Sequence, residues 1–409
     1  MFHPAIREAT EKATGHQPSS VKFETIAIRT QADRTQHREH STPIFPTSSF
    51  VFEDAEQMRA LFADEMEGNI YSRFTNPSVR EFEEKMALLE GVEDAVATAT
   101  GMAAVFASFL AFLKTGDHLL ASKAVFGSSY TIITQYLPKW GISYDWLPTD
   151  VANWQSLVKP NTKMLFLETP SNPGLDVIDL AFTGQFCKRN SLVFNIDNCF
   201  ATPYLQQPAR FGADLISHSA TKWIDGQGRV LGGVVAGNKA MVAEVKKLCR
   251  STGPSLSPFN AWVLSKSLET LAVRMDRHCE SALSLAQFLE QNGQVARVIY
   301  PFLDSHPMCA IAKQQMKKGG GIVAFEIRGG LERGRRFLNS VKLCSLSANL
   351  GDTRSIVTHP ASTTHAKLTE QARQDVGITD SLVRVSVGLE HIDDIVADID
   401  NALKISALQ

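Results

Sequence analysis

Short apolar segments alternate with helical patterns from about residue 71 onward, and this order constrains the fold more than any other feature of the chain. The segments have the length and the apolar character of strands, and helical candidates such as 101–114 and 179–190 lie between them. The predicted strands are 94–100, 118–122, 143–147, 164–169, 192–197, 214–219 and 232–237. Such an order is typical of an α/β fold with a mostly parallel sheet that helices cover.

The two ends of the chain differ from this central region. Residues 41–50 contain too many prolines for a regular central strand. Residues 258–293 form a helical stretch longer than usual, which we expect to lead into a second α/β domain. Strand patterns follow at 321–327, 341–351 and 382–390. We therefore predict an N-terminal arm (1–70), a large domain (71–265) and a smaller C-terminal domain (266–409).

Charge and cysteine content exclude several kinds of partner. The formal net charge of -2 provides no excess field for nucleic acid or for an anionic membrane, so a small-molecule partner is expected. The six cysteines include no C-x-x-C pair, which argues against a metal or redox motif and favours free thiols in the cytoplasm. We find no secretory signal and no apolar run long enough to span a bilayer.

Polar residues follow several predicted strands. In open α/β sheets ligands bind at the carboxyl ends of the strands, so these residues are candidates for one site: Thr100, Gly101, Asn172, Asp197, Ser219, Thr221 and Lys222. A glycine at the start of an apolar helix leaves N–H groups free for an anion. Taken one at a time, a turn glycine, a capping aspartate and a solvated lysine are the commoner interpretations.

The combination of Lys222 with Asp197 changes that balance. A lysine that forms a Schiff base needs burial to lower its pKa, and the apolar strand before Lys222 can provide it. An acid at the end of the preceding strand and an anion site complete what pyridoxal phosphate (PLP) requires. The segment 226–233 is a poor nucleotide loop, because Leu231 stands where the G-x-G-x-x-G pattern needs glycine.

Seven motifs then carry a family resemblance. They are YSRFTNPS (71–78), TGMAA (100–104), ETPSNP (168–173), DNCFATP (197–203), HSATKW (218–223), THPASTTH (358–365) and VRVSVGLE (383–390). In this order they resemble the Cys/Met-metabolism family of PLP-dependent enzymes, which includes cystathionine synthases and lyases, methionine γ-lyase and homoserine-ester sulfhydrylases. The resemblance implies the type I fold of PLP-dependent transferases, similar to that of aspartate aminotransferase. It is strongest to the sulfhydrylases.

The resemblance also implies roles for single residues. Lys222 would bind the cofactor and move protons, Asp197 would pair with the pyridine nitrogen, and Asn172 would contact the ring oxygen. The cofactor phosphate would be held by Gly101, Met102, Ser219 and Thr221. Tyr71 and Arg73 would reach the phosphate in a neighbouring subunit, which implies a homo-oligomer, with a tetramer favoured over a dimer. Asn349 and Arg384, together with Asn172, would bind the substrate. No metal site is expected.

Phe126 departs from the family pattern and bears on the reaction. Most relatives have a tyrosine that stacks on the cofactor there, and phenylalanine can stack but cannot transfer a proton. A carboxylate leaving group needs little protonation, so an ester substrate is favoured. The expected reaction converts O-succinylhomoserine and sulfide to homocysteine and succinate, in methionine biosynthesis. The alternatives are a cystathionine γ-synthase, an O-acetylhomoserine sulfhydrylase, a methionine γ-lyase and a non-catalytic binding protein.

Overall fold

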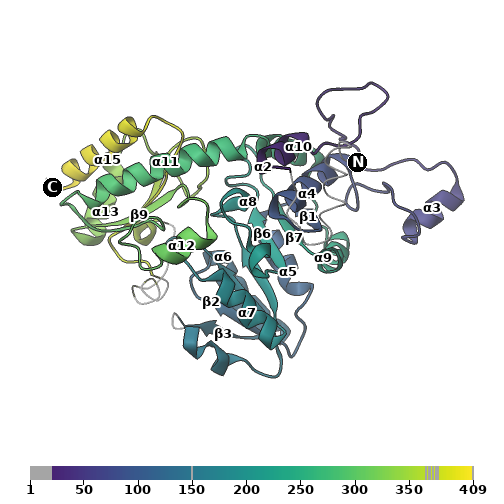
Figure 1. The fold of residues 1–409 in the computed structure, drawn as a ribbon, viewed down its shortest axis with the longest axis horizontal. Coiled ribbons are helices and arrows are strands. Elements are labelled where there is room, and N and C mark those ends of the chain that lie inside the picture. Colours follow the sequence, from purple (N-terminus) through teal and green to yellow (C-terminus); the bar gives the residue numbers. More distant parts are fainter. Residues whose placement is uncertain are drawn as a thin grey trace.

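The computed structural model describes residues 21–148, 151–363, 366, 370, 373 and 377–407 (Figure 1). The first twenty residues of the predicted arm and the end of the motif 358–365 lie outside the described residues. The described helices are α2 (Phe23–Arg29), α3 (Ala55–Phe62), α4 (Pro77–Glu90), α5 (Gly101–Leu110), α6 (Gly127–Thr131), α7 (Leu180–Asn190), α8 (Thr202–Leu205), α9 (Lys239–Thr252), α10 (Pro258–Leu268), α11 (Leu271–Glu290), α12 (Cys309–Gln315), α13 (Gly330–Ser340) and α15 (Ile392–Ala407).

A seven-stranded sheet forms the larger part of the molecule, in the order β1-β7-β6-β5-β4-β2-β3. Its strands are β1 (Asp94–Thr98), β2 (His118–Ser122), β3 (Ser143–Leu147), β4 (Thr162–Glu168), β5 (Val193–Asp197), β6 (Leu215–Ser219) and β7 (Gly233–Gly237). Strands β2 to β6 pair in parallel, whereas β7 runs antiparallel to both β1 and β6. The predicted α/β fold with a mostly parallel sheet is confirmed, with β7 as the exception.

Helices cover both faces of this sheet, which explains its continuous apolar strands. In β1, Ala95 and Ala97 join the core cluster that contains Phe82 of α4, whereas Val96 joins the cluster that contains Val242 of α9. Because successive side chains of a strand point to opposite faces, both faces of β1 are buried. Helix α5 packs on the same side as α9.

A second sheet of five strands lies in the C-terminal part, in the order β10-β11-β12-β9-β8. Its strands are β8 (Val295–Ile299), β9 (Ile322–Ile327), β10 (Ser345–Leu346), β11 (Ile356–Thr358) and β12 (Leu382–Ser386). Helices α11, α13 and α15 lie together over it and bury one apolar core (Figure 1). The predicted stretch 258–293 is two helices, because the chain turns at Glu269 and Thr270 between α10 and α11. The domain boundaries themselves stay a prediction.

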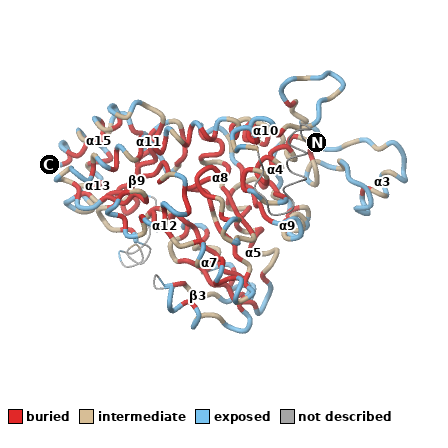
Figure 2. The backbone as a smooth tube through the Cα atoms, viewed as in Figure 1, coloured by how far each residue is buried: buried red, intermediate tan, exposed pale blue. Residues whose placement is uncertain are grey.

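The described part of the arm leaves the body of the protein and carries α3 away from both sheets (Figure 1). Most of this segment is exposed (Figure 2), including the apolar side chains of Val51 (99% exposed), Phe62 and Met66. Monomers seldom expose apolar side chains along an extended segment in this way.

Candidate active site

The carboxyl ends of β4, β5 and β6 lie side by side and define the candidate site. Glu168 at the end of β4 is in register with Asp197 of β5, and Asp197 is in register with Ser217 of β6. Lys222 follows β6 by one turn, since its N–H donates to the carbonyl of Ser219 at 3.2 Å. The structure therefore brings predicted residues from successive strands to one edge of the sheet.

Lys222 points toward the second sheet. Its Nζ donates to Oδ1 of Asn349 at 2.5 Å, and the neighbouring Trp223 is fully buried. Burial lowers the pKa of the Lys222 amine, and the positive charge of Arg384 lowers it further. A lysine with a lowered pKa supplies more of the neutral amine, which is the nucleophilic form.

Arg384 of β12 is the charged centre of the site and is only 6% exposed. Its Nη1 donates to Oδ1 of Asn172 at 2.8 Å, and its Nη2 donates to the carbonyl of Asn349 at 3.1 Å. Within the described residues, its buried Nε has no acceptor and no carboxylate oxygen lies within 4 Å of the guanidinium. Burial lowers the pKa of Arg384 to about 10. A buried guanidinium without an ion pair is suited to bind an incoming carboxylate.

The start of α5 forms a tight contact with the end of β6. Thr100 caps the helix by accepting the N–H of Ala103 at 3.1 Å, which leaves the N–H groups of Gly101 and Met102 outside the intrahelical pattern. A Cβ on Gly101 would lie 2.5 Å from Cβ of Ser219, so only glycine fits. Backbone N–H groups, a helix N-terminus and the Ser219 hydroxyl thus converge as donors for an anion.

Thr221, also predicted to hold the phosphate, already has partners within the protein. Its hydroxyl accepts the N–H of Gly232 at 3.1 Å and lies 3.3 Å from the carbonyl of the same residue. The side chain of Met102 packs against the core cluster that contains Val105 and Phe109. Any contact of Met102 with an anion would therefore come from its backbone, and the phosphate role of Thr221 stays a prediction.

Glu168 was not assigned a role from the sequence, although it opens the motif 168–173. Its Oε2 accepts the N–H of Phe126 at 2.8 Å, directly before α6. Burial and then the nearby charge of Asp197 raise the pKa of Glu168 well above its ordinary value. Burial also raises the pKa of Asp197, but the N–H of Cys199 at 2.9 Å and the charge of His218 oppose that rise. The register of β4 with β5, which the sequence does not reveal, is what pairs the two acids.

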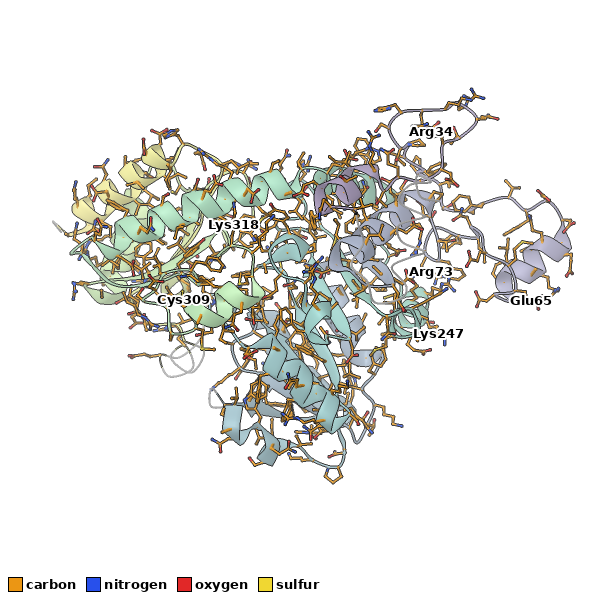
Figure 3. All side chains as sticks on the ribbon, viewed as in Figure 1. Arg34, Glu65, Arg73, Lys247, Cys309 and Lys318 are labelled. Carbon is orange, nitrogen blue, oxygen red and sulfur yellow. The ribbon has the colours of Figure 1, made fainter. Side chains whose placement is uncertain are left out.

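Arg73 lies at the root of the arm, beside α9 (Figure 3), and its guanidinium carbon lies 5.6 Å from the centroid of the Tyr71 ring. The guanidinium of Arg73 lies over the ring of Phe74 at 4.8 Å and donates to the carbonyl of Arg250. No hydrogen bond or ion pair in the described part of the chain joins Tyr71 or Arg73 to Lys222. The structure does not bring them into the site of their own subunit, and their predicted role in a neighbouring one stays a prediction.

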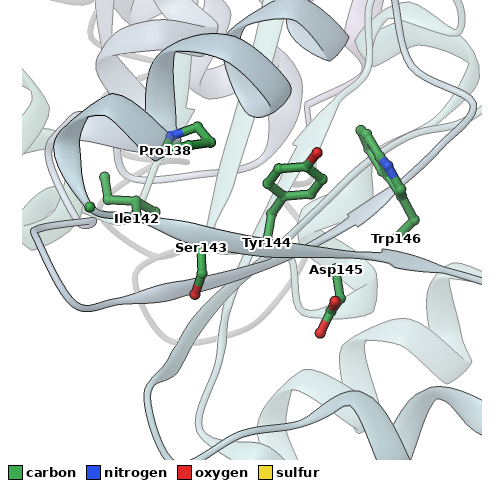
Figure 4. Close-up of a pocket in the computed structure, with 7 residues that line it drawn as sticks. Pro138, Ile142, Ser143, Tyr144, Asp145 and Trp146 are labelled. Atoms are coloured by element: carbon green, nitrogen blue, oxygen red, sulfur yellow. The ribbon is translucent and has the colours of Figure 1, made fainter.

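A separate hollow of about 600 Å³ lies at the outer edge of the large sheet (Figure 4). Residues 141–146 and Pro138 line it, with the rings of Tyr144 and Trp146 on one side of β3. Strand β3 is four strands from β6, which corresponds to about 19 Å at the usual spacing. The hollow contains none of the predicted site residues. Among the described residues, no group of three or more His, Cys, Asp or Glu side chains could hold a metal ion.

Comparison with known proteins identifies the family of the chain. The family model of Cys/Met metabolism PLP-dependent enzymes matches residues 24–404. The chain belongs to this family. It is 47% identical to the O-succinylhomoserine sulfhydrylase of Pseudomonas aeruginosa, over 93% of this chain and 95% of the relative. It is 40% identical to an L-methionine γ-lyase of Fusobacterium nucleatum, over 93% of this chain and 97% of the relative.

A solved structure from Campylobacter jejuni, assigned as an O-acetylhomoserine (thiol)-lyase and containing N′-pyridoxyl-lysine-5′-monophosphate, superposes with a TM-score of 0.90. It is 32% identical and covers 94% of this chain and all of its own. The type I fold and the PLP cofactor of the family are thereby established for this enzyme. The described part of the chain has no helix long and apolar enough to cross a membrane.

The residues present fit this cofactor. The glycine-only contact between Gly101 and Ser219 would leave donors for its phosphate, and Asp197 would provide an acid for the pyridine nitrogen. Lys222, with its lowered pKa, would provide the amine for the aldehyde. When bound, the cofactor supplies an electron sink for a carbanion at the substrate α-carbon.

Proposed function

We propose that this enzyme catalyses γ-replacement on an O-acylhomoserine, using O-succinylhomoserine and sulfide to form homocysteine and succinate. The buried, unpaired guanidinium of Arg384 beside the Lys222 amine carries the proposal, because it is suited to hold the α-carboxylate of an amino-acid substrate next to a base. The similarity to O-succinylhomoserine sulfhydrylases supports the choice of ester and nucleophile.

Each of these residues has a separate role in the proposed reaction. Arg384 and the amides of Asn172 and Asn349 orient the α-carboxylate. Nζ of Lys222 then removes the proton from Cα and returns a proton at the end of the reaction. A second proton, from Cβ, is removed before the Cγ–O bond breaks and succinate leaves with the bonding electron pair. The sulfur of sulfide then forms the new bond to Cγ, and protons return to Cβ and Cα. Phe126 can stack on the ring but offers no proton to a leaving group.

We also propose that the catalytic unit is a homo-oligomer, at least a dimer and in full a tetramer. Tyr71 and Arg73 would contact the phosphate in a neighbouring subunit, and the exposed apolar side chains of Val51, Phe62 and Met66 would be covered by that subunit. Light scattering of the holoenzyme gives the mass, and a monomer would contradict this proposal. The cytoplasmic location predicted from the sequence stays a prediction.

Methionine γ-lyase is the second candidate, because several relatives with that name are 38–40% identical to this chain. The lack of a hydroxyl at Phe126 disfavours it, since the thiolate that leaves methionine needs a proton more than a carboxylate does. Cystathionine γ-synthase and O-acetylhomoserine sulfhydrylase differ from the main proposal only in nucleophile or ester.

The test uses the purified holoenzyme, with Lys222→Ala as the inactive control. The enzyme is given O-succinylhomoserine with sulfide, the same ester with cysteine, the acetyl ester with sulfide, and methionine alone. We expect the fastest product formation to be homocysteine from the succinyl ester and sulfide. No homocysteine above the Lys222→Ala control would refute the proposal, and faster cystathionine formation or 2-oxobutyrate release would replace it with the matching alternative.

A further inference from the structure

Glu168, which is buried, and Asp197, which is half-buried, form a pair of acids at the carboxyl edge of the large sheet. They are register partners on neighbouring strands, which lie about 4.8 Å apart. Phe166 of β4 packs on Phe109 of α5, and Asn195 of β5 donates to Ser108 of α5. Because side chains alternate along a strand, Glu168 and Asp197 point to that same side of the sheet.

The surroundings of Glu168 contain no ion-pair partner. The residue is 3% exposed, and no described lysine, arginine or histidine nitrogen lies within 4 Å of its carboxyl group. Arg384, the nearby cation, donates instead to Asn172 and to the carbonyl of Asn349. A buried carboxylate without a paired cation is costly, and a second carboxylate on the next strand adds repulsion.

Asp197 differs from Glu168 in the groups around it. Oδ1 of Asp197 accepts the N–H of Cys199, and the charge of His218 favours the ionised form of Asp197. A protonated pyridine nitrogen of the cofactor would favour the same form. The other titratable groups near the pair are Lys222 and the thiol of Cys199. If only one of the two acids is ionised, these contacts favour ionisation of Asp197.

We propose that Glu168 is a positioning residue that works as an uncharged carboxylic acid. By keeping its proton, Glu168 leaves a single carboxylate charge on Asp197 for the cofactor and leaves Arg384 without an anion until substrate arrives. Its Oε2 meanwhile holds the N–H of Phe126, and so fixes the start of α6 from which the Phe126 ring reaches the site. The assignment of Phe126 and Arg384 to cofactor and substrate rests on the proposed function.

The first test probes the charge of Glu168 in the absence of substrate. In Glu168→Gln holoenzyme an amide of the same shape replaces the acid, and the pH midpoint of the visible absorbance of bound PLP is titrated. An uncharged Glu168 predicts a midpoint within about 0.3 pH unit of wild type, because the charge of the site does not change. A fall of about 1 unit or more would overturn the proposal, since it would show that a carboxylate charge beside a titrating cation had been removed.

Glu332→Gln is the matched control, because Glu332 is exposed on α13 in an ion pair with Arg335. Thermal unfolding of each holoenzyme checks the fold, and Glu168→Met provides a second neutral variant. This titration needs no homoserine ester, so its outcome is independent of which reaction the enzyme catalyses.

The second test separates the hydrogen bond from the charge. Glu168→Gln retains an acceptor for the N–H of Phe126, whereas Glu168→Met does not. We expect KM and kcat of Glu168→Gln to stay within about twofold of wild type, and kcat of Glu168→Met to fall about tenfold, as loss of one hydrogen-bond partner implies. Equal kcat values for the two variants would overturn the positioning role, and a tenfold rise in KM for Glu168→Gln would overturn the uncharged form.

Discussion

Substitution of Gly101 by alanine tests whether the contact between α5 and β6 forms the phosphate site. The added Cβ would lie 2.5 Å from Cβ, 2.7 Å from Cα and 2.8 Å from Oγ of Ser219. One of these atoms belongs to the backbone of β6 and cannot rotate away. Overpacking of this kind costs about 1–3 kcal/mol, and the better helix propensity of alanine returns at most about 1 kcal/mol.

The strain can relax only if the helix start and Ser219 move apart, which separates the donors for the phosphate. We therefore expect the Kd for PLP to rise about tenfold or more, the factor that corresponds to about 1.4 kcal/mol. The assay titrates the apoprotein with PLP and follows the visible absorbance, while urea unfolding of the apoprotein gives the stability cost separately.

Gly293→Ala is the matched control, since a Cβ at Gly293 meets nothing within 4 Å and its backbone is not in the left-handed region. Its Kd for PLP is expected to equal that of wild type. If Gly101→Ala lowers the stability of the apoprotein but leaves the Kd within twofold of wild type, the contact is structural and the phosphate lies elsewhere.

Three further predictions follow from the site and the core. Arg384→Lys loses the guanidinium fork, so KM for the homoserine ester is expected to rise about tenfold or more; an unchanged KM would place the α-carboxylate elsewhere. Phe126→Tyr adds a hydroxyl to a residue that is 43% exposed, so 2-oxobutyrate release from methionine is expected to increase; an unchanged rate contradicts the proton-transfer argument. Asp94→Asn is expected to lower the free energy of unfolding by about 1–2 kcal/mol at pH 7. Burial alone would raise the pKa of Asp94, but the ion pairs with Arg80 at 2.7 Å and Lys246 at 2.6 Å outweigh burial and lower the pKa. That contribution is present above the unfolded pKa of about 3.9 and is lost as the pH falls through the lower folded value, so urea unfolding should show the gap closing below about pH 4.

The sequence predicted most strands of the large sheet because both of their faces are buried, as the fully buried strand 118–122 with its apolar centre illustrates. The edge strand β3 is mostly half-exposed. Strand β8 was missed, because the exposed Ala296 and Arg297 interrupt its apolar pattern. The turn between α10 and α11 was also missed, since Glu269 and Thr270 are both compatible with a helix.

The residues after the strands were predictable as candidates, but their contacts were not. Lys222 meets Asn349, and Arg384 meets Asn172, across the two sheets and over long separations along the chain. No local pattern encodes those pairs. The role proposed for Glu168 depends on the order of β4 and β5, which the sequence leaves open.

Strand β7 separates the two halves of the candidate anion site. Gly233 of β7 is in register with Thr98 on one side and with Ser219 on the other, and a Cβ at Gly233 would lie 2.1 Å from the carbonyl of Thr100. The start of α5 therefore passes over the backbone of Gly233, which has no side chain, to reach Ser219. This arrangement requires β1 and β7, the first and last strands of the sheet along the chain, to be paired. Contacts this distant along the chain are slow to form, because a long loop must close first. PLP that binds this arrangement and not the unfolded chain would stabilise the folded sheet by mass action. The supply of cofactor would then set how much folded protein a cell maintains, as well as how active that protein is.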